Sequence, residues 1–149
     1  MAIEYRLTLA GDIPLEQVAA LAAPNATEAS SPAGNRLLSV NLDEERGYSV
    51  SITSGRHGYY DAEDDGGAAW EWKPDKYVDV NFRMRKNDPS GKGTPNMVSA
   101  VGKVLAGRPE DAALVLDGNY LLLTRVNGIL RKHNLATWYD EDYDNILPE

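Results

Sequence analysis

The sequence predicts an α+β fold in which one antiparallel sheet of about six to eight strands carries two helices on one face. Three observations lead to this prediction. Several segments alternate apolar and polar residues with a period of two, which is typical of half-buried strands. Two segments instead repeat apolar residues at steps of three and four, as amphipathic helices do. Asp-Gly and Asn-Gly pairs, which favour two-residue hairpin turns, join strands of the second half.

The first half of the chain is expected to contain three strands and one helix. Residues 3–9 alternate cleanly and predict the first strand. Residues 14–22 begin with a proline, which the first turn of a helix tolerates, and they carry one apolar face. The polar residues 25–35 show no periodicity and predict a loop. Residues 37–42 and 48–53 alternate again, and the short link between them ends in a glycine, which predicts a hairpin.

The second half has a similar order after a less regular middle. The expected elements are a weak strand at 58–63, an irregular or edge segment at 70–74, a strand at 78–84, a helix at 95–105 and a meander of strands at 113–116, 120–125 and 129–132. Both halves therefore run strand, helix, strand, strand. This order suggests a β-α-β-β duplication with a pseudo-two-fold axis, and chance order in an α+β chain is the alternative. The residues expected in the core include Leu7, Leu9, Val18, Leu38, Val50, Val80, Phe82, Val101, Leu105, Val115 and Leu122.

The composition excludes several classes of protein. The 149 residues suit one domain over residues 1–149, and 42% of them are hydrophobic, enough to fill its core. The chain has no cysteine and therefore no disulfide, thiolate metal site or cysteine nucleophile. Its formal net charge of −8 has the wrong sign for binding nucleic acid or an anionic membrane. Since the sequence shows neither a signal peptide nor an apolar run that could span a bilayer, we expect the cytoplasm.

The sequence contains no pattern of catalytic or cofactor-binding residues, so no enzyme activity, catalytic residue or cofactor is predicted. The two histidines, His57 and His133, each lie at a strand end and are expected to be exposed. We expect neither to lie within hydrogen-bond reach of both a carboxylate and a Ser or Thr in a pocket. The acidic runs at 61–66 and 140–144 resemble calcium loops. Both lack the glutamate that such a loop needs at position twelve, so no metal site is predicted.

Acidic residues and large aromatic rings occur together in two regions of the chain. One interpretation is a solvated acidic surface that keeps the protein soluble. The other is a partner-binding surface, because Tyr and Trp are favoured interface anchors and a concentrated negative field speeds the encounter with a basic partner. The residues assigned to the partner-binding surface are Asp61, Glu63, Asp64, Asp65, Trp70, Trp72, Trp138, Tyr139, Asp140, Glu141, Asp142, Tyr143 and Asp144.

Three parts of the chain resemble a known family. They are IEYRLTLAG at 3–11 with PLEQVA at 14–19, WEW at 70–72 with YVDVNFRM at 77–84, and PEDAA at 109–113 with LLLTR at 121–125 and KH at 132–133. These stretches are similar to the Sit-type (swarming inhibition toxin) immunity proteins of bacteria. The resemblance implies a cytoplasmic protein that neutralises a polymorphic toxin in kin-discriminating bacteria, and it carries over no catalytic residue.

Two functions from different classes are therefore open. The first is a non-enzymatic immunity protein that binds a cognate toxin through the acidic-aromatic surface; a basic toxin such as a nuclease would suit this surface. The second is a small-ligand-binding or enzymatic α+β domain that uses a cavity between the sheet and the helices. The inward positions of strands 3–9 and 78–84 are almost wholly apolar, which favours a solid core and the first function.

Overall fold

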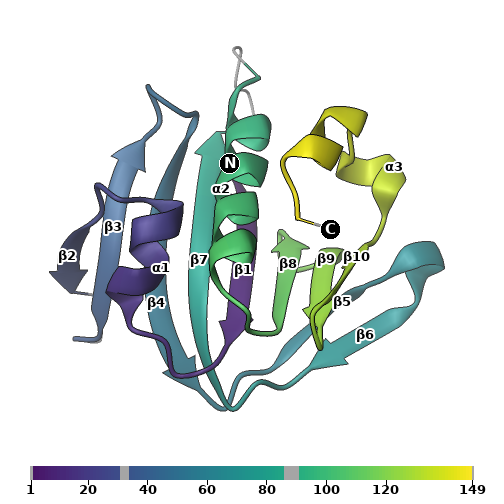
Figure 1. Ribbon diagram of the computed structural model, residues 1–149, viewed down its shortest axis with the longest axis horizontal. Helices are drawn as coiled ribbons and strands as arrows, with labels where there is room; N and C mark the ends of the chain where they lie inside the picture. The colour runs from purple at the N-terminus through teal and green to yellow at the C-terminus, as the bar shows by residue number, and fades with distance from the viewer. Residues whose placement is uncertain (1, 31–33, 86–90, 149) are drawn as a thin grey trace.

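One open sheet of ten strands forms the body of the protein (Figure 1). The computed structural model describes residues 2–30, 34–85 and 91–148. The strands are β1 (Ala2–Ala10), β2 (Thr27–Ser30), β3 (Arg36–Leu42), β4 (Tyr48–Arg56), β5 (Tyr60–Glu63), β6 (Ala69–Trp72), β7 (Lys76–Arg85), β8 (Ala112–Leu116), β9 (Tyr120–Val126) and β10 (Ile129–Lys132). The α+β class with a single sheet is confirmed, and the sheet has more strands than expected.

The strand order across the sheet is β2-β3-β4-β7-β1-β8-β9-β5-β6, with β10 beside β9. All pairs are antiparallel except the short parallel contact between β5 and β9. The central strand β1 pairs with β7 on one side and with β8 on the other. Its Leu7 lies opposite Val80 and Leu114, and all three side chains are fully buried. This register places the apolar set of each central strand on one face.

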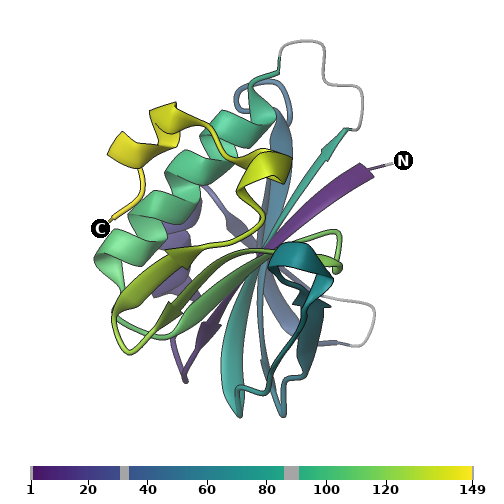
Figure 2. The same ribbon diagram turned by 90° about the vertical axis from the view of Figure 1, so that its right-hand side faces the viewer.

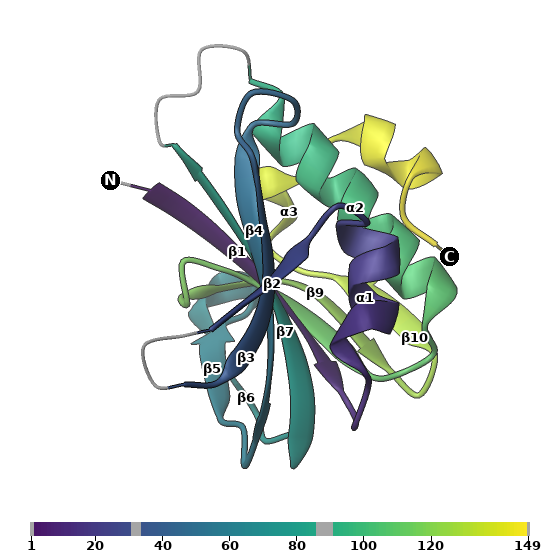
Figure 3. The same cartoon turned by 90° about the vertical axis from the view of Figure 1, so that its left-hand side faces the viewer.

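The helices α1 (Leu15–Ala22), α2 (Gly93–Gly107) and α3 (Leu135–Trp138) all lie on that face of the sheet (Figure 3). Two short 3-10 turns, η1 (Asp65–Gly67) and η2 (Glu141–Asn145), complete the described elements. The apolar stripe of α1 packs toward the sheet through its buried residues, as the sequence predicted. Among the described residues, no helix combines the length and the apolar character needed to cross a membrane.

Glycines in α2 allow neighbouring segments to approach the helix closely. A Cβ on Gly102 would lie 2.5 Å from the carbonyl oxygen of Ile146, a distance that real Cβ atoms do not show. A Cβ on Gly107 would lie 2.7 Å from Cδ1 of Leu21 in α1. The absence of these side chains therefore lets the C-terminal segment and α1 pack directly on α2.

All residues predicted for the core are buried, but they belong to two clusters. All except Val115 lie in the large core between the sheet and the helices. Val115 joins Ala113 and Leu121 in a smaller cluster on the helix-free face. Trp70 and Trp72 pack against this cluster. The aromatic residues of the middle segment therefore cover a second, smaller core.

Two parts of the chain differ from the predicted elements. Residues 27–30, inside the expected loop, form β2; residues 31–33 of that loop lie outside the described residues. All four residues of β2 are exposed, so no apolar alternation marks this strand, and its pairing with β3 alone defines it. Residues 135–138 form α3 and residues 141–145 form η2, where the sequence predicted no element. The segment expected to be irregular or an edge piece contributes β6, which is an edge strand of the sheet.

The two halves share an order of elements but not a two-fold arrangement in the sheet. β1 and β7 pair at the centre, as a pseudo-two-fold axis would require. β1 then pairs with β8, the first strand after α2, whereas β7 pairs with β4, the last strand of the first half. A two-fold axis would place β3 beside β7, so the strand order does not follow the predicted symmetric duplication.

Candidate functional site

The β5–β6 hairpin folds against the helix-free face of the sheet and presents two different surfaces (Figure 2). Successive residues of a strand point to opposite faces, so Ala62, Trp70 and Trp72 turn toward the sheet. Both tryptophans are half-buried, and their ring centroids lie 6.2 Å apart. These rings therefore anchor the hairpin to the sheet.

Tyr60 fixes the same hairpin to the central strands. Its hydroxyl donates to both carboxylate oxygens of Asp79 in β7 at 3.1 Å, and the Thr8 hydroxyl donates to Asp79 Oδ1 at 2.5 Å. Asp79 is only 8% exposed. Burial raises the pKa of this carboxyl, because the charged form loses its hydration. Hydrogen bonds from the Tyr60 and Thr8 hydroxyls thus stabilise the ionised form of Asp79, and the loss of hydration on burial destabilises it.

The outer surface of the hairpin carries carboxylates. Asp61, Glu63 and Glu71 are exposed there, and an open groove of about 610 Å³ runs past them toward the β8–β9 turn. Trp70 and Tyr120 also line this groove, and Tyr120 is 42% exposed. We call these five residues the hairpin surface. It combines three exposed carboxylates with the exposed ring of Tyr120 and the half-buried ring of Trp70, a combination that suits a partner-binding surface.

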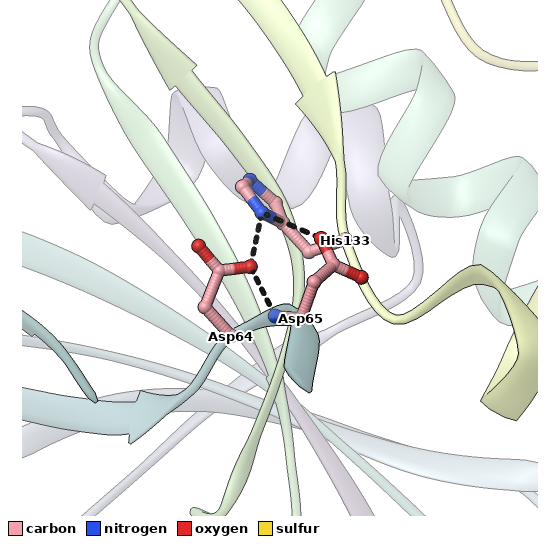
Figure 4. Close-up of side chains that lie close together, drawn as sticks. All are labelled: Asp64, Asp65 and His133. Carbon is pink, nitrogen blue, oxygen red and sulfur yellow. Dashed lines mark hydrogen bonds and ion pairs between the residues drawn. The ribbon is translucent and has the colours of Figure 1, made fainter. Parts of the chain in front are cut away.

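The end of the hairpin is tied to the last strand by His133 (Figure 4). Nδ1 of His133 lies 2.7 Å from Asp64 Oδ1, and the Asp65 backbone N–H donates to the same carboxylate oxygen. Burial alone would raise the pKa of Asp64, but these hydrogen bonds hold it below its usual value. The Asn134 N–H donates to Asp65 at 2.8 Å, so η1 lies beside the start of α3.

We expected no histidine within hydrogen-bond reach of both a carboxylate and a hydroxyl in a pocket, and His133 does reach both groups, although it lines none of the grooves described here. Nε2 of His133 lies 2.9 Å from Thr124 Oγ1 while Nδ1 contacts Asp64. The expected exposure of His133 is wrong, since its side chain is 12% exposed, whereas His57 is exposed as predicted. A carboxylate, imidazole and hydroxyl in this order are the groups that activate a nucleophile. Thr124 is buried in β9, however, which shields its side chain from solvent.

The same cluster contains the residue types that bind metal ions. One ligand atom from each of Asp64, Asp65 and His133 lies within 4.8 Å of the other two, in the part of the chain that the structure describes. Both ring nitrogens of His133 already have partners, Asp64 and Thr124. One oxygen of Asp65 accepts from the Asn134 backbone. Both ring nitrogens and one oxygen of each carboxylate are therefore paired within the protein, and these contacts hold the hairpin in place.

The aromatic residues of the C-terminal segment lie mostly in the core. Trp138 is 9% exposed, and its Nε1–H donates to the His133 carbonyl at 2.8 Å. Tyr143 is buried and stacks on Trp138 with 6.1 Å between ring centroids. Tyr139 is half-buried and contacts both rings. In the free protein, Trp138 and Tyr143 are therefore not available as surface anchors.

The acids of this segment remain exposed, but two of them have structural partners. Asp140 accepts from the Asp142 N–H at 3.0 Å and so caps η2, and Asp144 pairs with Lys132 at 3.2 Å. The carboxylates of Glu141 and Asp142 form no hydrogen bond or ion pair with any described residue. We call Asp140, Glu141, Asp142 and Asp144 the tail acids.

The structure brings these two acidic regions to the same half of the molecule. α3 starts beside η1 and leads to the tail acids (Figure 1). A third acidic run, residues 43–45, lies in the β3–β4 turn at the other side of the sheet. Sequence reasoning missed Glu71 and Tyr120. The period of two around Trp70 and Trp72 could have placed Glu71 on the opposite face, whereas only the long-range contact between β5 and β9 brings Tyr120 to the site.

The comparisons with known proteins agree with the sequence resemblance. No curated protein and no solved structure shows significant similarity to the chain. The family described as SitI3-like matches residues 3–142, which is nearly the whole chain, and it confirms the resemblance to the Sit-type immunity proteins. The chain belongs to the SitI3-like family.

Proposed function

We propose that the protein is a cytoplasmic immunity protein that binds a cognate protein toxin and neutralises it without catalysis. Family membership supports the immunity role, which protects a bacterium from the toxins of competing or kin cells. The observation that carries the binding site is the hairpin surface, where exposed carboxylates lie on a hairpin whose other side is anchored in a core. Such a surface is rigid before binding, which lowers the entropic cost of association.

The carboxylates of the hairpin surface repel one another in the free protein. Asp61 lies directly opposite Glu71 across the β5–β6 pair. Like charges at directly opposed positions destabilise a sheet. Neither Asp61 nor Glu63 has a hydrogen-bond or ion-pair partner on its carboxylate among the described residues. A basic partner would relieve this repulsion, so the surface is better suited to a complex than to the free chain.

The groove on this surface fits a cationic side chain. A lysine or arginine that entered it would meet the carboxylates of Asp61 and Glu63 and the rings of Trp70 and Tyr120. A cation over an aromatic face contributes about 0.5–2 kcal/mol, more when it is desolvated. We therefore propose a toxin with a basic surface, as a nuclease has, and we expect electrostatic steering to speed the association.

The test compares two charge-matched variants. In the hairpin variant, Asp61→Asn, Glu63→Gln and Glu71→Gln remove three charges, and the Gln at position 71 still accepts from Tyr59. In the control, Asp43→Asn, Glu44→Gln and Glu45→Gln remove three charges from the β3–β4 turn. The binding partner is the toxin domain that we expect a neighbouring reading frame to encode, used in a catalytically inactivated form. Its association is measured by stopped flow at low and at physiological ionic strength.

We expect the hairpin variant to associate at least about tenfold more slowly than wild type at low salt, because local complementary charge dominates steering. The control should change the rate by less than about threefold, because a charge far from the contact is screened beyond about 8–10 Å. Equal slowing of both variants would show that only the net charge matters. Wild-type protein that does not bind the toxin domain would refute the function itself.

A further inference from the structure

A second groove lies between the β5–β6 hairpin and the helix-free face of the central strands. Its volume is about 460 Å³, and it shares Asp61 with the groove of the hairpin surface. Arg6 of β1 and Arg83 of β7 line it from the sheet and Tyr60 lines it from the hairpin, and its other charged lining residues are Glu4, Asp61 and Asp117. The two grooves therefore adjoin, and the second places two arginines next to the acidic hairpin surface.

The two arginines of this groove differ in whether their side chains have partners within the protein. Arg6 is held in place, because its Nε donates to Asn81 at 3.0 Å and its Nη2 lies 3.4 Å from Glu4. Arg83 is exposed, and its side chain forms no hydrogen bond or ion pair with any residue that the structure describes. In a chain of net charge −8, an arginine beside Glu4 in the sheet register would be expected to form a pair. Its guanidinium instead remains available.

The hairpin wall of the groove is fixed before any ligand arrives. The Tyr60 hydroxyl bonds to the buried Asp79, and the Tyr60 ring lies edge-on to Tyr77 at 5.7 Å and tilted to Trp72 at 6.0 Å. The buried Asp79 carboxylate is costly and contributes no apolar packing, yet it orients this wall. A preorganised wall beside an unpaired guanidinium is the arrangement that binding sites use.

We propose that this groove receives a carboxylate side chain of the cognate toxin, which Arg83 binds with Arg6 beside it. A guanidinium can bind a carboxylate through two parallel hydrogen bonds, which fixes orientation as well as charge. The inference rests on the proposed function. It adds a second contact, in which the immunity protein supplies the positive charge and the toxin the negative one. The toxin surface would carry an acidic side chain next to its basic patch, so a toxin with only a basic patch would leave Arg83 unpaired and bind less well.

The first test uses the inactivated toxin domain and two charge reversals. Arg83→Glu should weaken binding at least about tenfold, mainly through faster dissociation, because it places like charges at a contact. The control Arg46→Glu makes the same change of charge at an exposed position in the β3–β4 turn, and its effect should stay below about threefold. Thermal unfolding of both variants confirms that each remains folded.

Three outcomes are distinguishable. If Arg83→Glu and Arg46→Glu bind as wild type does, the carboxylate contact is wrong while the proposed function stands. If wild-type protein does not bind the toxin domain, both proposals fail. If Arg83→Glu weakens binding and an acidic residue of the toxin, changed to lysine, restores it, the contact is confirmed.

A second test needs no toxin. Hexaglutamate, titrated at low salt, should shift the NMR signals of the Arg83 and Arg6 side chains, whereas hexalysine should shift the amides of the β5–β6 hairpin. The Arg83→Glu variant should lose the response to hexaglutamate and keep the response to hexalysine. Hexaglutamate shifts that are equal in the variant and in wild type would overturn the proposal.

Discussion

The Tyr60 hydroxyl is expected to hold the β5–β6 hairpin on the sheet through its hydrogen bonds to Asp79. Tyr60→Phe keeps the ring and its contacts with Tyr77 and Trp72, and it removes only the donor. A hydrogen bond to a charged group contributes about 1.5–3 kcal/mol, and one between neutral groups contributes about 0.5–1.5 kcal/mol. We therefore expect Tyr60→Phe to lower the free energy of unfolding by about 2 kcal/mol at neutral pH.

The size of this loss should depend on pH. Burial raises the pKa of Asp79 in the folded protein. A group with a raised folded pKa stabilises the fold fully below its unfolded pKa of about 3.9, and this stability is lost as the pH rises through the folded pKa. Removing the Tyr60 donor raises the pKa of Asp79 further, because the carboxylate loses a hydrogen bond. The stability difference between wild type and variant should therefore widen from about pH 4 to about pH 7.

Urea unfolding followed by tryptophan fluorescence measures this difference at both pH values. The matched control is Tyr59→Phe, since Tyr59 is 55% exposed and its hydroxyl donates to the exposed Glu71 at 2.7 Å. This control should change the free energy of unfolding by less than about 0.5 kcal/mol. Equal losses in the two variants, or a Tyr60→Phe loss that does not change with pH, would refute the assignment of Asp79 as the anchor.

Three further predictions concern the C-terminal region and the η1 turn that lies beside it. Trp138→Ala should lower the free energy of unfolding by about 3 kcal/mol, because the ring is buried; a change below about 1 kcal/mol in urea unfolding would contradict this. Glu141→Gln with Asp142→Asn should slow toxin association at low salt without loss of stability, and an unchanged rate would leave the tail acids a solubilising surface. Asp64→Asn should increase hydrogen exchange in η1. The hydrogen bonds lower the pKa of Asp64 in the folded protein. Wild type should therefore be more stable than the variant above about pH 4, and this advantage should disappear as the pH falls through the folded pKa. An advantage that does not change with pH would exclude the contact with His133.

Local signals predicted the central elements correctly. The alternation in β1 and β7 places Leu7 and Val80 in the core, because the sheet buries one face of these strands. The Asn127-Gly128 pair forms the expected two-residue turn, with positive φ at Asn127. The Asp117-Gly118 pair also lies in a hairpin turn with positive φ at Asp117, but that turn has three residues because Leu116 pairs with Tyr120. These features depend on residues that are close in sequence, so they can be recognised without knowledge of the fold.

The candidate site depended on contacts that local signals do not contain. Trp70 and Trp138 stand among acids and were assigned to a surface, yet one covers the second core and the other lies in the main core. His133 follows a strand end and was expected to be exposed, but Asp64, far away in sequence, closes over it. Composition shows that aromatic and acidic residues are adjacent in the chain, whereas only the topology decides which of them reach the surface.

We propose that this protein neutralises its toxin by binding and not by catalysis. The most direct measurement titrates the protein into a fixed amount of the active toxin domain and follows the remaining toxin activity. A tight binder should reduce the activity linearly to zero at one molar equivalent, and the result should not change with incubation time. Complete loss of toxin activity at a small fraction of an equivalent, progressing with time, would contradict the account and would direct attention to the Asp64, His133 and Thr124 cluster as a catalytic centre.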